Sequence, residues 1–227
     1  MRELVRSVWV ITQKDLLVEA RTREIFYTTV FFAVACVLVF AFAFVKEGRA
    51  LPDAAAGILW IAIAFSGTLA LGRAFERERY GETLRALMVA PIDRPALYLG
   101  KLLGILILLG CVEALIVPLV GLMFQAAFFE HAALMLGLLA AGTIGFAAVG
   151  TLFAAMLVRA RSRDMLLPVL LYPITVPVII AGVRGTAALL QPEASEAMAR
   201  AWLAMLVFFD VVFVTLALWT FEPVMTE

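Results

Sequence analysis

The chain has 227 residues, of which 64% are hydrophobic, against about 45–50% in soluble globular proteins. An ordinary soluble protein of this length is therefore excluded, and the formal net charge of zero gives no reason to expect a nucleic-acid partner. The two cysteines, Cys36 and Cys111, allow neither a disulfide framework nor a CxxC redox pair.

Residues 1–24 predict an amphipathic helix. Its apolar side is formed by residues that recur at helical spacing, namely Leu4, Val5, Val8, Trp9, Thr12, Leu16 and Ala20. The segment lacks the uncharged apolar run of a secretory signal peptide. We expect it to lie in the membrane interface with Trp9 at headgroup depth. The alternative is a solvated helix that packs on another soluble protein.

Six apolar stretches follow, each roughly as long as the 20 or so residues that a helix needs to cross the hydrocarbon layer. They are Ile25–Val45, Ala54–Gly72, Leu102–Phe124, Ala132–Val158, Met165–Val183 and Ala201–Phe221. Four of them contain no charged residue, and the third and sixth contain one acid each. The pattern predicts an all-α integral membrane protein with six transmembrane helices.

The placement of basic residues predicts the topology. Most of the 18 lysines and arginines fall before the first stretch, between the second and third, and between the fourth and fifth. The positive-inside rule assigns these segments to the cytoplasm, so both termini are expected there. The segments Lys46–Asp53, Gln125–His131 and Arg184–Arg200 are expected on the far side of the membrane.

The connection Arg73–Lys101 contains a second candidate for a short helix. Its first half is rich in charges, and Leu84, Leu87 and Met88 then form an apolar patch at helical spacing before Pro91 ends the helix. A helix of this kind can dock into a groove on a soluble partner. The alternative is a charged loop that only fixes the topology.

Two acids lie near the centres of apolar stretches, Glu113 in the third and Asp210 in the sixth. An ionised acid at mid-bilayer costs at least a few kcal/mol, so such groups are neutral, paired or placed in a wet cavity. No lysine or arginine falls inside a stretch to pair with them. Each acid is either a polar site in a conduit or ATP-driven hinge, or a hydrogen-bonding link to a neighbouring helix.

Proline and small residues suggest how the helices bend and pack. Pro168, Pro173 and Pro177 predict a bent or broken fifth span, which either moves with ATP binding or forms a static kink. Small residues recur at every fourth position of the second and fourth stretches, namely Ala62, Ser66, Ala70, Gly137, Ala141 and Gly145. Such stripes permit close helix approach, within one chain or between two copies.

The run Gly57–Lys101 resembles the signature region of the haem exporter B family, CcmB, of cytochrome c maturation. The similarity consists of a GxxW start at Gly57–Trp60, a charged exit from the second stretch, a glycine-led helix, a proline turn and a lysine that opens the third stretch. The proline-bearing run Leu166–Gly182 is similar to the fifth span of that family. The exit from the second stretch is more basic than is usual in the family.

The resemblance implies an ABC-2 type exporter permease, with residues 1–227 as a single permease domain in the bacterial inner membrane. It implies two copies per complex, a CcmA-like ATPase subunit, CcmC-like and CcmD-like membrane proteins and a CcmE-like haem chaperone. Haem would be the handled or transported ligand, with no covalently bound cofactor. The ATPase-coupling helix implied by the resemblance contains Tyr80, Gly81, Glu82, Leu84, Leu87, Met88 and Pro91.

The sequence leaves two alternative functions open and gives no sign of an ATP-binding site. No G-x-x-x-x-G-K-[ST] motif occurs, so ATP would be used by another chain and this one would be no enzyme. The first alternative is a permease of the same architecture that exports a lipid, glycan or drug. The second is a membrane enzyme that uses Glu113 and Asp210 as acid and base, although no nucleophile or metal cluster accompanies them. The single histidine, His131, is expected to be solvated, with a haem contact as the lesser alternative.

Overall fold

The computed structural model describes residues 2–44, 52–75, 94–158, 160, 162–191 and 193–226, and these residues form helices and short connections without strands. A first helix, α1 (Arg2–Thr22), precedes six helices that are long and apolar enough to cross a membrane. The six are α2 (Glu24–Phe44), α3 (Pro52–Ala74), α6 (Arg94–Phe124), α7 (Ala132–Met156), α8 (Arg163–Leu190) and α9 (Glu196–Thr226). The prediction of an all-helical protein with six apolar helices is confirmed.

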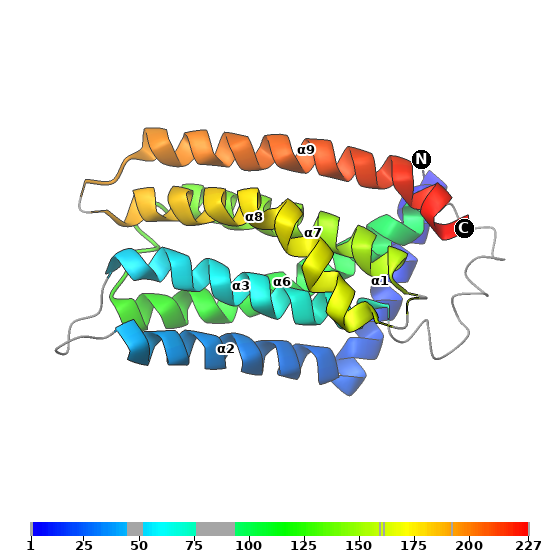
Figure 1. Cartoon of the computed structure of the whole chain (residues 1–227), viewed down its shortest axis with the longest axis horizontal. Coiled ribbons are helices and arrows are strands. Elements are labelled where there is room, and N and C mark those ends of the chain that lie inside the picture. Colours follow the sequence, from blue (N-terminus) through cyan, green and yellow to red (C-terminus); the bar gives the residue numbers. More distant parts are fainter. Residues whose placement is uncertain are drawn as a thin grey trace.

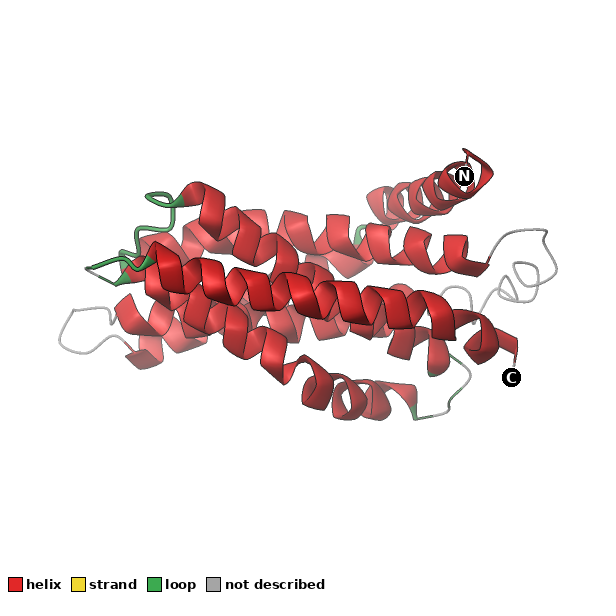
Figure 2. Cartoon of the chain, turned by 90° about the horizontal axis from the view of Figure 1, so that it is seen from above, coloured by secondary structure: helices red, strands yellow, loops and turns green. Residues whose placement is uncertain are grey.

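The six long helices run side by side, and α1 lies across one end of the bundle (Figures 1 and 2). Both chain termini lie at this end, which we call the terminal end. The last residues of α3 and the first residues of α6 lie there too, because the six helices alternate in direction. The expectation that both termini face the cytoplasm stays a prediction.

Several helices extend beyond the apolar stretches that identify them. Helix α6 begins at Arg94 rather than Leu102, α8 continues to Leu190, and α9 begins at Glu196. Pro95 is tolerated in the first turn of α6, where the missing N–H would have no helical partner. Hydropathy therefore locates the part of each helix that suits the bilayer, whereas the turn residues decide where the helix ends.

A single residue joins α1 to α2. Arg23 has a φ of 54°, in the left-handed region that residues with side chains rarely adopt, and this lets the chain change direction sharply. Beside it, Glu19 Oε1 accepts a hydrogen bond from the backbone N–H of Phe26 at 2.8 Å. The carboxylate thus satisfies one of the N–H groups that the first turn of α2 leaves without a helical partner.

The middle of the bundle is built around Trp60 of α3, whose side chain is 2% exposed. Its indole ring lies against Gly142 of α7 and Gly182 of α8, where an added Cβ would overlap the ring. The indole Nε1 donates a hydrogen bond to Thr186 Oγ1 at 3.0 Å. We call this arrangement the Trp60 slot, because only glycine leaves room for the ring at both positions.

The stripe of small residues in α7 packs on α9 of the same chain. A Cβ added at Gly137 would meet the side chain of Leu203, and one added at Gly145 would meet Phe209 and Asp210 Oδ1, the latter at 2.6 Å. Of the two alternatives open from the sequence, the stripe therefore serves packing within the chain at these glycines.

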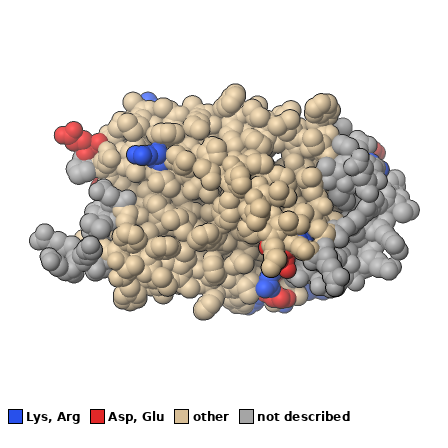
Figure 3. All heavy atoms as spheres, in the orientation of Figure 1, with Lys and Arg blue, Asp and Glu red and all other residues tan. Residues whose placement is uncertain are grey.

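Large apolar side chains cover the outside of the bundle. Phe31 and Phe42 of α2 and Trp219 of α9 are 75%, 83% and 79% exposed. The face in Figure 3 has no charged side chain across its middle, and the charged residues lie toward the two ends. An apolar band of this extent requires lipid or another apolar surface around it.

Candidate functional site

Glu113 lies inside the bundle on α6, with 9% of its surface exposed. The hydroxyl of Thr143 on α7 donates a hydrogen bond to Glu113 Oε1. The structure therefore provides the neighbouring-helix hydrogen bond that one interpretation of this acid required. A hydrogen bond between two helices also removes part of the cost of placing a carboxyl group among apolar side chains.

A cavity of about 480 Å³ opens beside this pair, between α6 and α7. Its lining is apolar except for Glu113 and Thr143, and includes Pro118, Phe129 and Leu136. Phe129 and Leu136 are also well exposed on the outer surface. We call this space the α6/α7 cavity. A largely apolar cavity with one polar pair suits a mostly apolar molecule that presents a single polar group.

Asp210 is placed differently. It lies on α9 against Gly145 of α7, and its Oδ1 has no hydrogen-bond partner among the described residues. Thr143 and Gly145 are two positions apart on α7, which turns them about 200° from each other on the helix. Glu113 and Asp210 therefore approach α7 from opposite sides, so the structure does not bring them together as an acid–base pair.

Helix α8 contains Pro168, Pro173 and Pro177 within one continuous helix. Figure 1 shows that the first part of α8 runs obliquely to the rest, so the helix is bent rather than broken. Next to the central proline, the hydroxyl of Tyr172 accepts a hydrogen bond from Thr68 Oγ1 of α3 at 3.1 Å. Whether this bend moves with ATP binding stays a prediction.

The predicted ATPase-coupling residues, from Tyr80 to Pro91, lie outside the described residues. The neighbouring described residues are Phe75, directly after α3, and Arg94, which begins α6. Both belong to the terminal end of the bundle, where α1 also lies.

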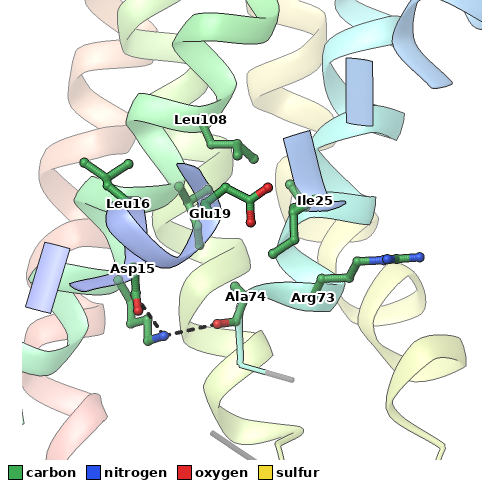
Figure 4. Close-up of a pocket in the computed structure, with 11 residues that line it drawn as sticks. Asp15, Leu16, Glu19, Ile25, Arg73, Ala74 and Leu108 are labelled. Carbon is green, nitrogen blue, oxygen red and sulfur yellow. Dashed lines mark hydrogen bonds and ion pairs between the residues drawn. The ribbon is translucent and has the colours of Figure 1, made fainter. Parts of the chain in front are cut away.

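At the terminal end the structure shows that the lysine that opens the third apolar stretch is a buried cation. Lys101 of α6 has a side chain that is 4% exposed, and its Nζ lies 2.9 Å from Asp15 Oδ2 of α1. The same ammonium group donates to the carbonyl of Ala74, the last residue of α3, at 3.2 Å. Figure 4 shows both interactions as dashed lines beside a small cavity of about 70 Å³. We call Asp15, Ala74 and Lys101 the junction.

His131 is less solvated than expected. It precedes α7, its side chain is 28% exposed, and its Nδ1 lies 3.2 Å from Glu196 Oε1 at the start of α9. Arg200 contacts the second oxygen of the same glutamate at 2.6 Å. Among the described residues, no group of three or more His, Cys, Asp or Glu side chains is arranged to hold a metal ion.

The chain is a multi-pass helical membrane protein. This class is defined by its six long apolar helices and its apolar outer band, and the Glu113–Thr143 pair faces a cavity in the bundle. The family described as CcmB protein matches residues 6–225, and the chain belongs to this family. The resemblance inferred from Gly57–Lys101 is thereby confirmed.

The curated relatives are bacterial proteins named heme exporter protein B. Those of Paracoccus denitrificans and Rhodobacter capsulatus are each 32% identical to the chain over 152 residues, covering 67% of this chain and 69% of the relative. The protein of Pseudomonas aeruginosa is 29% identical over 188 residues, covering 82% of each chain.

Proposed function

We propose that the chain is the permease subunit of an ABC transporter that exports or delivers haem for the biogenesis of c-type cytochromes. The observation that supports this most strongly is the CcmB match over residues 6–225, on a chain with six apolar helices. Membership of this family supports a role as a component of a membrane transport system. The transport step would be powered by ATP hydrolysis in a separate subunit.

The terminal end is proposed to face the cytoplasm and the ATPase subunit. Both termini, the basic helix α1 and the residues that flank 76–93 lie at this end. Tyr80–Pro91 would dock on the ATPase subunit. Two copies of the chain would form the membrane unit, together with CcmC-like and CcmD-like proteins, and the haem would reach a CcmE-like chaperone outside.

Within the membrane, the α6/α7 cavity is proposed as the place where the permease meets a polar group of its ligand or of a moving helix. Glu113 and Thr143 are its polar lining, so any polar contact made there involves this pair. The bend in α8 would allow the bundle to change shape around the cavity. Export of a lipid, glycan or drug remains the alternative function for the same architecture.

Complementation tests the function directly. A strain that lacks its own haem exporter B should regain c-type cytochromes when this chain is expressed with its cognate ATPase and membrane partners. Replacing both Leu84 and Leu87 by Asp should abolish co-purification with the ATPase subunit while membrane insertion is retained. No recovery of cytochrome c by a complex that assembles and hydrolyses ATP would favour the alternative exporter.

Reporter fusions test the orientation separately. Fusions at Ala90, Arg161 and Glu227 should report the cytoplasm. Fusions at Arg49, Glu130 and Glu193 should report the side of the membrane opposite the cytoplasm. A cytoplasmic signal at Glu193 would show that α8 does not cross the membrane.

A further inference from the structure

The junction connects three separate parts of the chain through one buried ammonium group. Lys101 belongs to α6, Asp15 to α1 and Ala74 to the end of α3, and Nζ lies 2.9 Å from Asp15 Oδ2 and 3.2 Å from the Ala74 carbonyl oxygen. A cation with so little exposure is stable only while it is paired, because removing its partner leaves a desolvated charge. These contacts therefore depend on one another.

The position of Ala74 gives the junction its significance. As the last residue of α3, it belongs to the turn whose carbonyls have no N–H partner within the helix and which forms the negative end of the helix dipole. The ammonium group supplies a donor and a positive charge at this point. It also lies 5.2 Å from the centre of the Phe75 ring, the next residue along the chain. Lys101 therefore fixes the place where the chain leaves α3 toward residues 76–93.

Helix α1 is attached to α6 directly beside Lys101. Thr12 Oγ1 donates a hydrogen bond to the carbonyl of Gly100 at 3.1 Å. Ile11 packs so closely on Gly100 that an added Cβ would lie 2.8 Å from the Ile11 side chain. Only a residue without a side chain permits this approach of α1 to α6. Asp15 is one turn further along α1, which brings its carboxylate to Lys101.

A second ion pair nearby provides a useful contrast. Lys14 Nζ lies 2.9 Å from Asp15 Oδ1, but the Lys14 side chain is 43% exposed. Exposed ion pairs contribute little because water screens both charges, whereas the pair with Lys101 is largely withdrawn from water. We therefore expect the contact of this carboxylate with Lys14 to matter less than its contact with Lys101.

We propose that Lys101 and Asp15 are positioning residues that join α1, the end of α3 and the start of α6 into one mechanical unit. A displacement that the ATPase subunit imposes on residues 76–93 is thereby passed to α1 and to both helices that flank the segment. Helix α1 thus takes part in coupling ATP hydrolysis to the permease instead of only anchoring the chain at the membrane surface. This inference rests on the proposed function, because it requires an ATPase partner.

The experiment uses the whole complex in lipid nanodiscs and compares Asp15→Asn with the control Lys14→Gln. Both substitutions remove an ion pair of Asp15, but only the first removes the carboxylate of α1 that contacts the buried Lys101 ammonium group. We expect Asp15→Asn to retain the ATPase subunit and to hydrolyse ATP, while haem delivered per ATP hydrolysed falls severalfold. Lys14→Gln should keep the wild-type ratio. An unchanged ratio in Asp15→Asn would overturn the inference.

A conservative variant and a neutral variant separate positioning from folding. Lys101→Arg keeps a cation within reach of both acceptors and should retain most of the coupling. The double variant Asp15→Leu/Lys101→Met replaces the buried charges by apolar groups and should fold, but methionine cannot hold the Ala74 carbonyl. Its ratio of haem to ATP should therefore fall as in Asp15→Asn. A wild-type ratio in the folded double variant would show that the junction serves stability alone.

A spin label at Leu17, which is 61% exposed on α1, gives a readout that needs no haem. In the wild-type complex its mobility should change when a non-hydrolysable ATP analogue binds, and this response should be lost in Asp15→Asn. If the wild-type complex shows the label response but delivers no haem, the proposed substrate is wrong and the junction stands. If the label responds equally in both proteins, the inference about the junction is wrong.

Discussion

The Trp60 slot and the α6/α7 cavity both bring a polar side chain into the membrane-spanning part of the chain, yet they differ in the space around it. The indole of Trp60 donates to Thr186 in a place where glycines leave no free volume. Glu113 also has a partner, Thr143, but a cavity of about 480 Å³ lies beside the pair. A satisfied hydrogen bond alone therefore does not separate a structural group from a functional one, and the adjoining space is the difference between the two places that substitutions can test.

The difference in free space predicts different effects of substitutions at the two places. A change in a closed slot displaces its neighbours, so its effect should fall on folding. A change beside an open cavity alters the surface that a ligand or a moving helix meets, so its effect should fall on activity. The following substitutions test this distinction in order of the effect that we expect.

Gly142→Ala should have the largest effect on stability. The new Cβ would overlap the six-membered ring of Trp60, and overpacking of this kind typically costs about 1–3 kcal/mol, with the upper end expected for an overlap this close. The loss of stability is measured as the decrease in the melting temperature of the purified chain in detergent. Gly57→Ala is the matched control in α3, because a Cβ there meets nothing within 4 Å and should stabilise the helix slightly. Equal melting temperatures in the two variants would show that the slot is not closed.

Thr143→Val and Glu113→Gln should separate stability from activity at the α6/α7 cavity. The first leaves the buried carboxyl group without its donor, at a cost of about 1–3 kcal/mol. The second keeps the size and hydrogen-bonding capacity, so stability should change by no more than about 0.5 kcal/mol. We nevertheless expect Glu113→Gln to lower the yield of c-type cytochromes severalfold.

The measurement for Glu113→Gln is cytochrome c yield at equal amounts of membrane-inserted chain, with binding of the ATPase subunit as a control. A yield equal to that of the wild type would make the Glu113–Thr143 bond a purely structural link between α6 and α7. Loss of ATPase binding would instead place the defect in folding.

The six membrane helices could be predicted from the sequence because length and hydropathy are properties of each segment by itself. The contacts between helices could not. The stripes of small residues predicted close helix approach, but they included neither Gly142 nor Gly182, the two glycines that lie against the ring of Trp60. In the same way Lys101 could be recognised as the lysine that opens the third apolar stretch, but its pairing with Asp15 could not be predicted, because that pairing depends on how α1 turns at Arg23 and crosses α6.

Asp210→Asn should change little, in contrast to Glu113→Gln. Asp210 Oδ1 has no hydrogen-bond partner among the described residues, and the side chain lies against Gly145 rather than in the α6/α7 cavity. No bond is lost in the variant, so stability should change by less than about 1 kcal/mol and cytochrome c yield should be retained. A fall in yield as large as that of Glu113→Gln would show that α9 has its own role in transport.

His131→Gln should have the smallest effect of all. The contact of His131 with Glu196 joins the starts of α7 and α9, but the glutamate is 44% exposed, and ion pairs in such surroundings contribute about 0–1 kcal/mol. Glutamine can still donate to Glu196, so the melting temperature and the cytochrome c yield should both match the wild type. Glu196→Gln is the informative comparison, because it removes the charge that faces both His131 and Arg200. If His131→Gln alone abolished haem delivery with folding intact, the histidine would contact the haem, and a functional site would exist at the end of the bundle opposite the junction.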